Sequence, residues 1–64
     1  MKHKIRIDDE ALIGRQRVKV TEPYKVTGYW NVVIIDDVDP KNIGESRVVS
    51  GGTIAMFRVK SLGR

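Results

Sequence analysis

The residues best suited to binding chemistry in this sequence are basic side chains at alternating positions. Arg15, Arg17 and Lys19 are each separated by one residue, and Val18 and Val20 occupy alternate positions. Alternate side chains of a strand share one face and lie about 6.5 to 7 Å apart, a spacing that can follow a phosphate backbone. The basic residues that we expect to contact nucleic-acid phosphates are Arg15, Arg17, Lys19, Lys4, Arg6 and Arg58.

An aromatic residue completes this candidate nucleic-acid site. Tyr29 and Trp30 are adjacent, so on a strand their side chains point to opposite faces. We expect Tyr29 to stack on a base beside the basic row, as aromatic side chains do in proteins that bind single strands. The alternative is that Trp30 anchors the core with Tyr29 at its rim, and that the basic row is a solvated sheet face that hinders edge pairing.

Residues for catalysis or metal binding form no recognisable set in this sequence. His3 is the only histidine, there is no cysteine, and no serine or threonine can be matched with a general base. Helix capping and turn formation account for the acidic clusters at 8–10 and 36–39, since Pro40 and Lys41 stand where a cation loop would place further ligands and its glycine. We therefore predict a protein that is not an enzyme and uses no cofactor or metal.

Length and charge restrict the protein further. The 64 residues allow a single small domain over residues 1–64, which buries only about 60% of the surface of its unfolded chain and has no room for a deep cavity. The net charge of +4 attracts polyanions in general. There is no cysteine, and no apolar run approaches the roughly 18 to 20 residues that cross a bilayer. We therefore expect a cytoplasmic protein with no membrane partner and no small-molecule substrate.

Apolar residues alternate with period two over most of the chain, which predicts strands rather than helices. Strands are expected over residues 4–7, 15–20, 29–35, 47–50 and 53–59. A helical turn is expected over 9–13, where Gly14 ends it, and Glu22-Pro23 is expected to end the second strand. The pair Gly51-Gly52 predicts a hairpin turn, and the turn-forming residues of 36–45 predict a long connection.

The same pattern assigns a core. Its expected residues are Ile5, Ile7, Leu12, Val18, Val20, Trp30, Val32, Ile34, Val48, Ile54, Phe57, Val59 and Leu62. The strand over residues 29–35 is apolar on both faces, so we expect it to be central and covered on both sides.

Two parts of the chain carry a family resemblance. Residues 13–28, in which a basic and valine strand lies between Gly14 and Gly28, and the β-branched residues 32–36 resemble the opening of small SH3-like barrels. The KOW modules of ribosomal proteins and transcription elongation factors are among these, although they usually have two close glycines in the loop. Residues 57–62 are similar to the last strand and helical turn of such barrels. The resemblance implies an all-β, SH3-like (or OB-like) barrel of about five strands with one short helical turn.

A fold of this kind does not fix a function, and two hypotheses remain. The first is a nucleic-acid binding module that uses the basic strand face. The second is a protein-interaction adaptor that offers a groove or an open strand edge to a partner peptide or to another copy of itself. In that case residues 36–45 and an exposed Met56 or tyrosine are expected to form the contact. Small proteins of this second kind are frequent in phage and mobile-element genomes.

Overall fold

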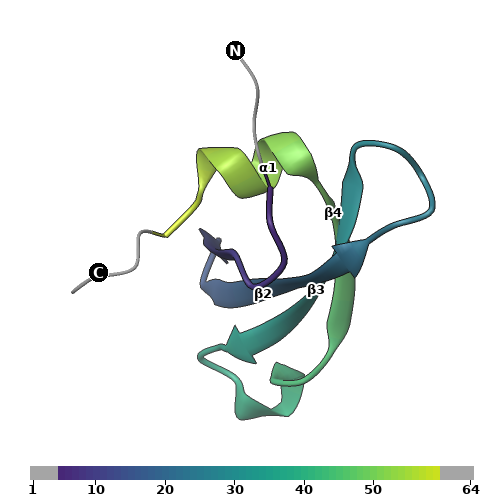
Figure 1. The fold of residues 1–64 in the computed structure, drawn as a ribbon. Coiled ribbons are helices and arrows are strands. Elements are labelled where there is room, and N and C mark those ends of the chain that lie inside the picture. The colour runs from purple at the N-terminus through teal and green to yellow at the C-terminus, as the bar shows by residue number, and fades with distance from the viewer. Residues whose placement is uncertain (1–4, 60–64) are drawn as a thin grey trace.

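Residues 5–59 are described by the computed structural model, and they form one antiparallel sheet with two short helical segments (Figure 1). The strands lie side by side in the order β1-β2-β3-β4. The elements are β1 (Glu10–Ile13), β2 (Gln16–Pro23), β3 (Tyr29–Asp36), the 3-10 helix η1 (Pro40–Asn42), β4 (Ser46–Ser50) and α1 (Gly51–Met56). The prediction of a mostly β fold is confirmed. Predictions for residues 1–4 and 60–64 lie outside the described residues.

β2 and β3 form the centre of the sheet and confirm the two strands predicted there. Their pairing shifts register beside Arg17 and again at Thr21, between Val20 and Glu22. Such bulges increase the local twist of a sheet. The strand direction accordingly turns strongly from β2 to β4, and the sheet bends around the face that carries α1 (Figure 1). We call this face the inner face.

β2 extends beyond Val20, the predicted last residue of the strand, and it ends at Pro23, so Glu22-Pro23 terminates the strand as expected but forms part of it. Tyr24 donates its backbone N–H to the Tyr29 carbonyl at 3.0 Å. The alternation of antiparallel hydrogen bonds therefore places Pro23 at a position that makes no bond to β3, where the missing N–H is harmless. Residues 24–28 form the loop that joins β2 to β3.

The two elements predicted before β2 are wrong. Residues 5–9 lie outside the strands of the sheet, and residues 10–13 form β1 rather than a helical turn. Backbone pairing with β2 competes with the helix: Asp8 donates to the Val20 carbonyl and Val20 donates to the Asp9 carbonyl, both at 2.8 Å. Gly14, with φ of 64°, then begins a two-residue turn into β2. A single helical turn is too weak to resist this pairing.

The hairpin predicted at Gly51-Gly52 is also wrong, because these glycines begin α1. Ser50 caps the helix: its hydroxyl accepts the Thr53 backbone N–H at 3.2 Å. Gly51 donates its N–H to the Gly28 carbonyl at 2.8 Å, and a Cβ on Gly51 would meet the Trp30 indole nitrogen at 3.4 Å. The bond to Gly28 therefore holds the start of α1 beside the loop before β3.

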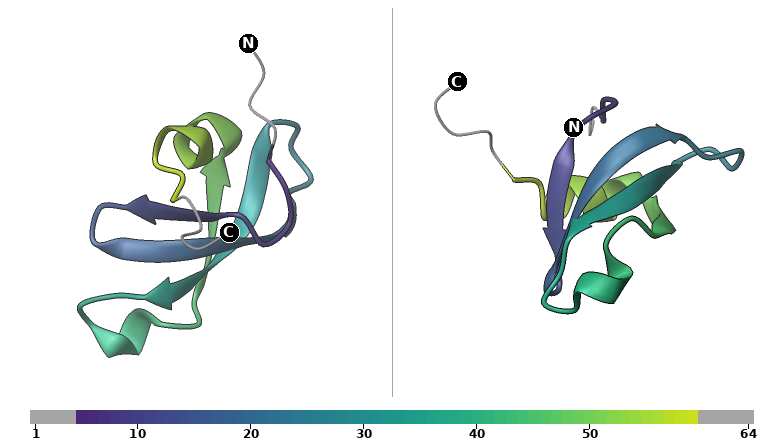
Figure 2. Two further views of the ribbon diagram at one scale, coloured as in Figure 1. Left: turned by 60° about the vertical axis from the view of Figure 1, so that its left-hand side comes forward. Right: turned by 90° about the horizontal axis from the view of Figure 1, so that it is seen from below.

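After α1 the chain returns to β1, in place of the long last strand that was predicted. Arg58 forms an antiparallel bridge with Ala11. Two backbone hydrogen bonds flank this bridge, from Leu12 to the Phe57 carbonyl at 3.0 Å and from Val59 to the Glu10 carbonyl at 2.9 Å. The far edge of β1 is thus covered by the segment that follows α1, as the left view of Figure 2 shows.

The core lies on the inner face of the sheet. Its buried residues are Ala11, Val18, Val20, Val32, Ile34 and Ile54, with Ile5, Ile13, Trp30 and Val49 packed against them. α1 contacts both β1 and β4, and Ile54 is the residue through which it joins the core. Five of the expected core residues are confirmed as buried, and Ile5 and Trp30 pack against them.

Four residues that were expected in the core are exposed instead. Ile7, Leu12, Val48 and Phe57 are 45 to 50% exposed. The strand register explains two of these errors, because Ala11 and Val49 face inward where the neighbouring Leu12 and Val48 were expected. The prediction that β3 is covered on both faces is wrong as well: Val32 and Ile34 are buried, whereas Ile35 on the other face is 36% exposed.

Truncation of Ile54 tests the importance of this helix contact. We expect Ile54→Ala to lower the free energy of unfolding by about 2–5 kcal/mol, because it leaves a cavity in a core of few residues. Met56→Ala is the matched control, since Met56 is 75% exposed and its truncation should change stability by less than about 0.5 kcal/mol. Urea unfolding followed by Trp30 fluorescence measures both. Equal effects of the two substitutions would contradict the assigned core.

Candidate functional site

The predicted basic row lies on the outer face of the sheet, opposite the core, and carboxylates accompany it. The Arg17 guanidinium donates to the Glu10 carboxylate at 2.8 Å. The Lys19 ammonium lies 3.9 Å from the Asp8 carboxylate. Both cations remain 41% exposed, so these pairs add at most about 1 kcal/mol to stability. Their main effect is to reduce the positive potential of this face.

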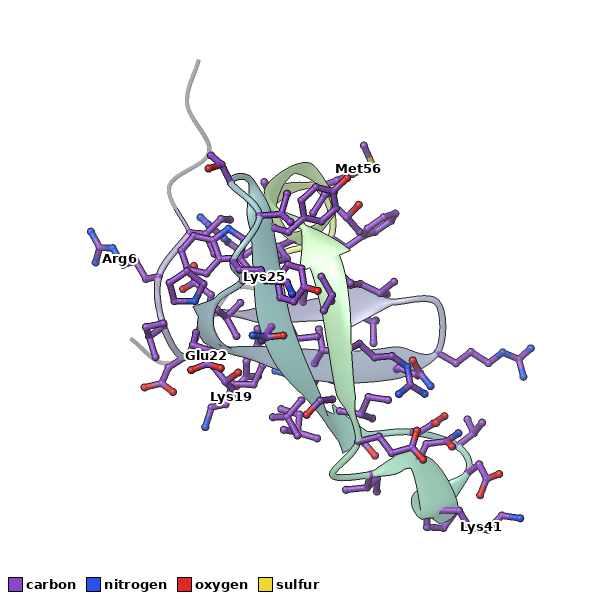
Figure 3. The ribbon with its side chains drawn as sticks, turned by 90° about the vertical axis from the view of Figure 1, so that its right-hand side faces the viewer. Arg6, Lys19, Glu22, Lys25, Lys41 and Met56 are labelled. Carbon is purple, nitrogen blue, oxygen red and sulfur yellow. The ribbon has the colours of Figure 1, made fainter. Side chains whose placement is uncertain are left out.

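The remaining predicted cations do not extend the row as one surface. Arg58 donates to the Asp9 carboxylate at 3.2 Å, beside β1. Arg15 is exposed in the turn between β1 and β2 rather than on the strand. Arg6 points outward from the segment before β1 (Figure 3), and Lys4 lies outside the described residues.

The formal charges of the described residues balance. Residues 5–59 contain eight lysines and arginines and eight aspartates and glutamates. The net charge of +4 is therefore carried by Lys2, Lys4, Lys60 and Arg64. The acidic cluster 8–10 is the reason that the basic strand does not make the folded sheet strongly positive. Sequence reasoning predicted a capping role for this cluster and missed the pairing, which depends on the register of β1 with β2.

Tyr29 lies on the outer face and is 44% exposed, whereas Trp30 faces inward and is partly buried. The expected opposition of these two neighbours is confirmed. The outer-face residues of β3 and β4 include four apolar ones, interspersed with Asn31, Ser46 and Ser50. We call this group the outer apolar patch; it consists of Tyr29, Val33, Ile35 and Val48, with Asn31 paired to Val48 at its centre.

β4 borders this patch and forms the other edge of the sheet. Two backbone bonds fix the alternation of its hydrogen bonds. At one end Ile34 donates to the Glu45 carbonyl at 2.9 Å, and at the other Gly51 donates to the Gly28 carbonyl at 2.8 Å. Bonded and non-bonded pairs alternate along an antiparallel ladder, so every second residue between Glu45 and Gly51 bonds to β3.

This alternation assigns a direction to each backbone group of β4. Arg47 and Val49 bond to β3, and the N–H and carbonyl groups of Ser46, Val48 and Ser50 point to the free edge. The Ser46 carbonyl accepts a hydrogen bond from the Arg47 guanidinium at 3.0 Å, and Ser50 caps α1. Among residues 5–59, the outward backbone groups of Val48 have no partner. The sequence pattern did not reveal this edge, because it predicted a hairpin there.

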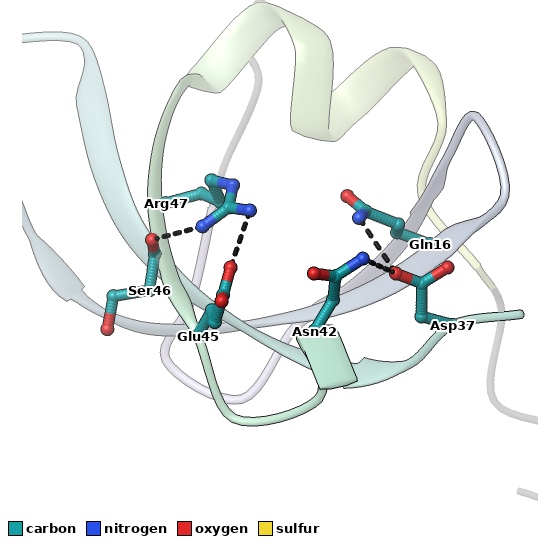
Figure 4. Close-up of polar contacts among 6 residues, drawn as sticks. All are labelled: Gln16, Asp37, Asn42, Glu45, Ser46 and Arg47. Carbon is teal, nitrogen blue, oxygen red and sulfur yellow. Dashed lines mark hydrogen bonds and ion pairs between the residues drawn. The ribbon is translucent and has the colours of Figure 1, made fainter. Parts of the chain in front are cut away.

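A polar cluster anchors the connection between β3 and β4 (Figure 4). The same carboxylate oxygen of Asp37 accepts hydrogen bonds from the side-chain amides of Asn42, at 2.7 Å, and Gln16, at 3.0 Å. These bonds lower the pKa of Asp37 below its ordinary value of 3.8. Gly44, with φ of 95°, then completes a turn in which Glu45 donates to the Asn42 carbonyl at 3.1 Å. The start of β4 is thus fixed.

Within residues 5–59, no three acidic or histidine side chains are placed to hold a metal ion. Neither helical segment in that part of the chain has the length and apolar character needed to cross a membrane. Comparison with known proteins found no matching family model, curated protein or solved structure.

The Asp37 cluster makes a prediction about pH. Because its pKa is lowered on folding, the charged carboxylate stabilises the fold above pH 3.8, and this contribution is lost as the pH falls through the lower pKa of the folded state. We expect Asp37→Asn to reduce the free energy of unfolding at neutral pH, and the difference from wild type to vanish in strong acid. Urea unfolding between neutral and strongly acidic pH measures this difference.

Asp36→Asn is the matched control for this measurement, because the exposed Asp36 carboxylate accepts no hydrogen bond in the described part of the chain. A pH dependence altered equally by both substitutions would show that the Asp37 cluster has no special contribution.

Proposed function

We propose that this chain is a small, non-enzymatic protein-interaction module that binds an extended segment of a partner protein along the free edge of β4. The observation that carries this proposal is Val48. Its backbone N–H and carbonyl point away from β3, and its side chain is 45% exposed within the outer apolar patch. In strand addition, backbone groups of this kind supply affinity and alternate side chains supply specificity.

The distribution of apolar side chains supports an interaction role. Among residues 5–59, six hydrophobic residues are buried and ten large ones are at least 36% exposed. Besides the outer apolar patch, the exposed residues include Met56, which points away from α1 (Figure 3), and Val38 and Ile43 in the connection before β4. Apolar surface that the domain leaves uncovered is typical of surfaces that bind other proteins.

We propose further that the bent sheet is an SH3-like barrel in which the segment after α1 is the fifth strand. The bridge between Ala11 and Arg58 supports this interpretation, as does the contact of α1 with both β1 and β4. A cytoplasmic location agrees with the lack of cysteine.

Nucleic-acid binding through the basic strand face is the second candidate function. Its support is that Arg15 is exposed with no ion pair among residues 5–59, and that Arg17 and Lys19 remain 41% exposed beside their carboxylates. A phosphate can replace such weakly held carboxylates. Tyr29 is available for stacking on the same outer face.

Strand addition is tested by removal of one backbone donor. Val48→Pro deletes an N–H that makes no bond to β3, and proline is tolerated on edge strands, so we expect the fold to survive. Peptides selected on the wild-type chain from a random library should bind this variant at least about tenfold more weakly. Val48→Thr is the matched control because it keeps the N–H and the branched side chain, and it should retain binding. Isothermal titration measures the affinities, and circular dichroism confirms the fold.

Equal peptide affinities of the Val48→Pro and Val48→Thr variants would contradict strand addition at this edge.

The nucleic-acid candidate is tested by its salt dependence. Binding of a single-stranded oligonucleotide through three or four phosphates should give a slope of about −3 in a plot of log affinity against log salt. We expect Arg15→Gln to make the slope shallower by about one and Lys41→Gln to leave it unchanged, because Lys41 lies on η1 rather than on the basic strand and points away from the sheet (Figure 3). Fluorescence anisotropy measures both slopes. No binding at low salt would exclude this candidate.

A further inference from the structure

We propose that the partner of the β4 edge is a second copy of this chain, paired antiparallel to the first about a two-fold axis at Val48. This inference rests on the proposed function and adds the identity of the partner. In a two-fold symmetric pair both copies present the same surface, so that surface must be complementary to itself. The β4 edge meets this requirement because its outward backbone groups are centred on one residue, which presents both a donor and an acceptor.

The pairing follows directly from the alternation along β4. Val48 lies opposite Val48 of the second copy, and each donates its N–H to the carbonyl of the other. Ser50 lies opposite Ser46 of the second copy, but the Ser46 carbonyl already accepts from the Arg47 guanidinium of its own chain, so the Val48 pair makes the main backbone contact. On the outer face the order Ser46, Val48, Ser50 is the same in both directions, so the side chains also match under the two-fold operation.

Charge supports a copy as the occupant. Arg47 is the only charged residue of β4, and its guanidinium pairs with the Glu45 carboxylate of its own chain at 2.7 Å (Figure 4). In the proposed dimer Arg47 lies opposite Val49, so no two like charges face each other directly. β4 and Glu45 together have no net charge. This favours a partner segment that is also neutral over one that is strongly charged.

The outer apolar patch becomes continuous across the dimer. Val48 sits beside Tyr29 and Val33 on the outer face, and the two-fold axis brings both copies of this group together in one sheet of eight strands. Five residues of each chain form the backbone contact, which is small for a protein interface. We therefore expect an association that depends on concentration in the micromolar to millimolar range.

A charge swap at the axis tests the proposal, because Val48 is the residue that meets itself. Val48→Lys and Val48→Glu should each weaken self-association at least about tenfold, since like charges then face each other. An equimolar mixture of the two variants should associate at least as strongly as wild type. Arg15→Glu is a matched control for altered charge, because Arg15 is exposed in the turn between β1 and β2, on the other side of the strand order from β4, and it should leave self-association unchanged. Sedimentation equilibrium over a concentration series measures each sample.

The outcomes separate this inference from the proposed function. A wild-type chain that is monomeric at millimolar concentration, or a mixture that associates no better than either variant alone, overturns the two-fold dimer. If selected peptides nevertheless lose affinity in the Val48→Pro variant, strand addition stands with a different partner. If the peptides also bind Val48→Pro as well as Val48→Thr, both proposals are wrong.

Discussion

The burial of Ile54 is the contact on which the arrangement of the sheet depends. It is the only buried residue of α1, and α1 contacts β1 and β4, the first and last strands of the sheet. A flat sheet cannot bring both of these strands to one short helix. The sheet must bend, and the register shifts in β2 provide the bend at the strand that joins β1 to the rest. The bend of the sheet is therefore what allows β1 and β4 to pack against the same helix around Ile54.

The bend also determines which residues remain outside. With Val18, Val20, Val32 and Ile34 facing the core, the alternate positions of β2 and β3 face solvent. On β2 these positions carry cations, and the register with β1 sets carboxylates beside them. On β3 they are mostly apolar and lie next to β4. One continuous outer face is therefore divided into a charge-balanced half and an apolar half, and the apolar half borders the free edge.

Strands with strong alternation were predictable from the sequence, whereas elements decided by distant pairing were not. β2 and β3 could be located because valines and isoleucines alternate or dominate there over several residues. Residues 10–13 look like one helical turn locally, and only pairing with β2 makes them a strand. Gly51 and Gly52 suit a hairpin turn equally well, and the serine cap before them together with the contact to Gly28 decides for a helix.

In the candidate site, too, local features could be predicted from the sequence and features that depend on distant pairing could not. The opposite directions of Tyr29 and Trp30 followed from strand geometry alone, because adjacent residues of a strand alternate. The pairing of Arg17 with Glu10 required the register, and the free groups of Val48 required the whole topology. No local pattern specifies that a strand lies at an edge, since that property depends on what the rest of the chain fails to cover.

The two edges of the sheet differ in a way that bears on function. The chain covers β1 by returning to it at Arg58, whereas the outward groups of Val48 in β4 have no partner in the described part of the chain. Proteins commonly protect free edges with lysine, proline or bulges, because unpaired strands associate with one another. At the free edge of β4 the central residue is instead an exposed valine, and the turn at Gly44 and the cap at Ser50 define the two ends of the strand. An edge that is short, fixed at both ends and unprotected at its centre offers few registers for pairing, and this property is the physical basis for the proposal that β4 binds a partner strand.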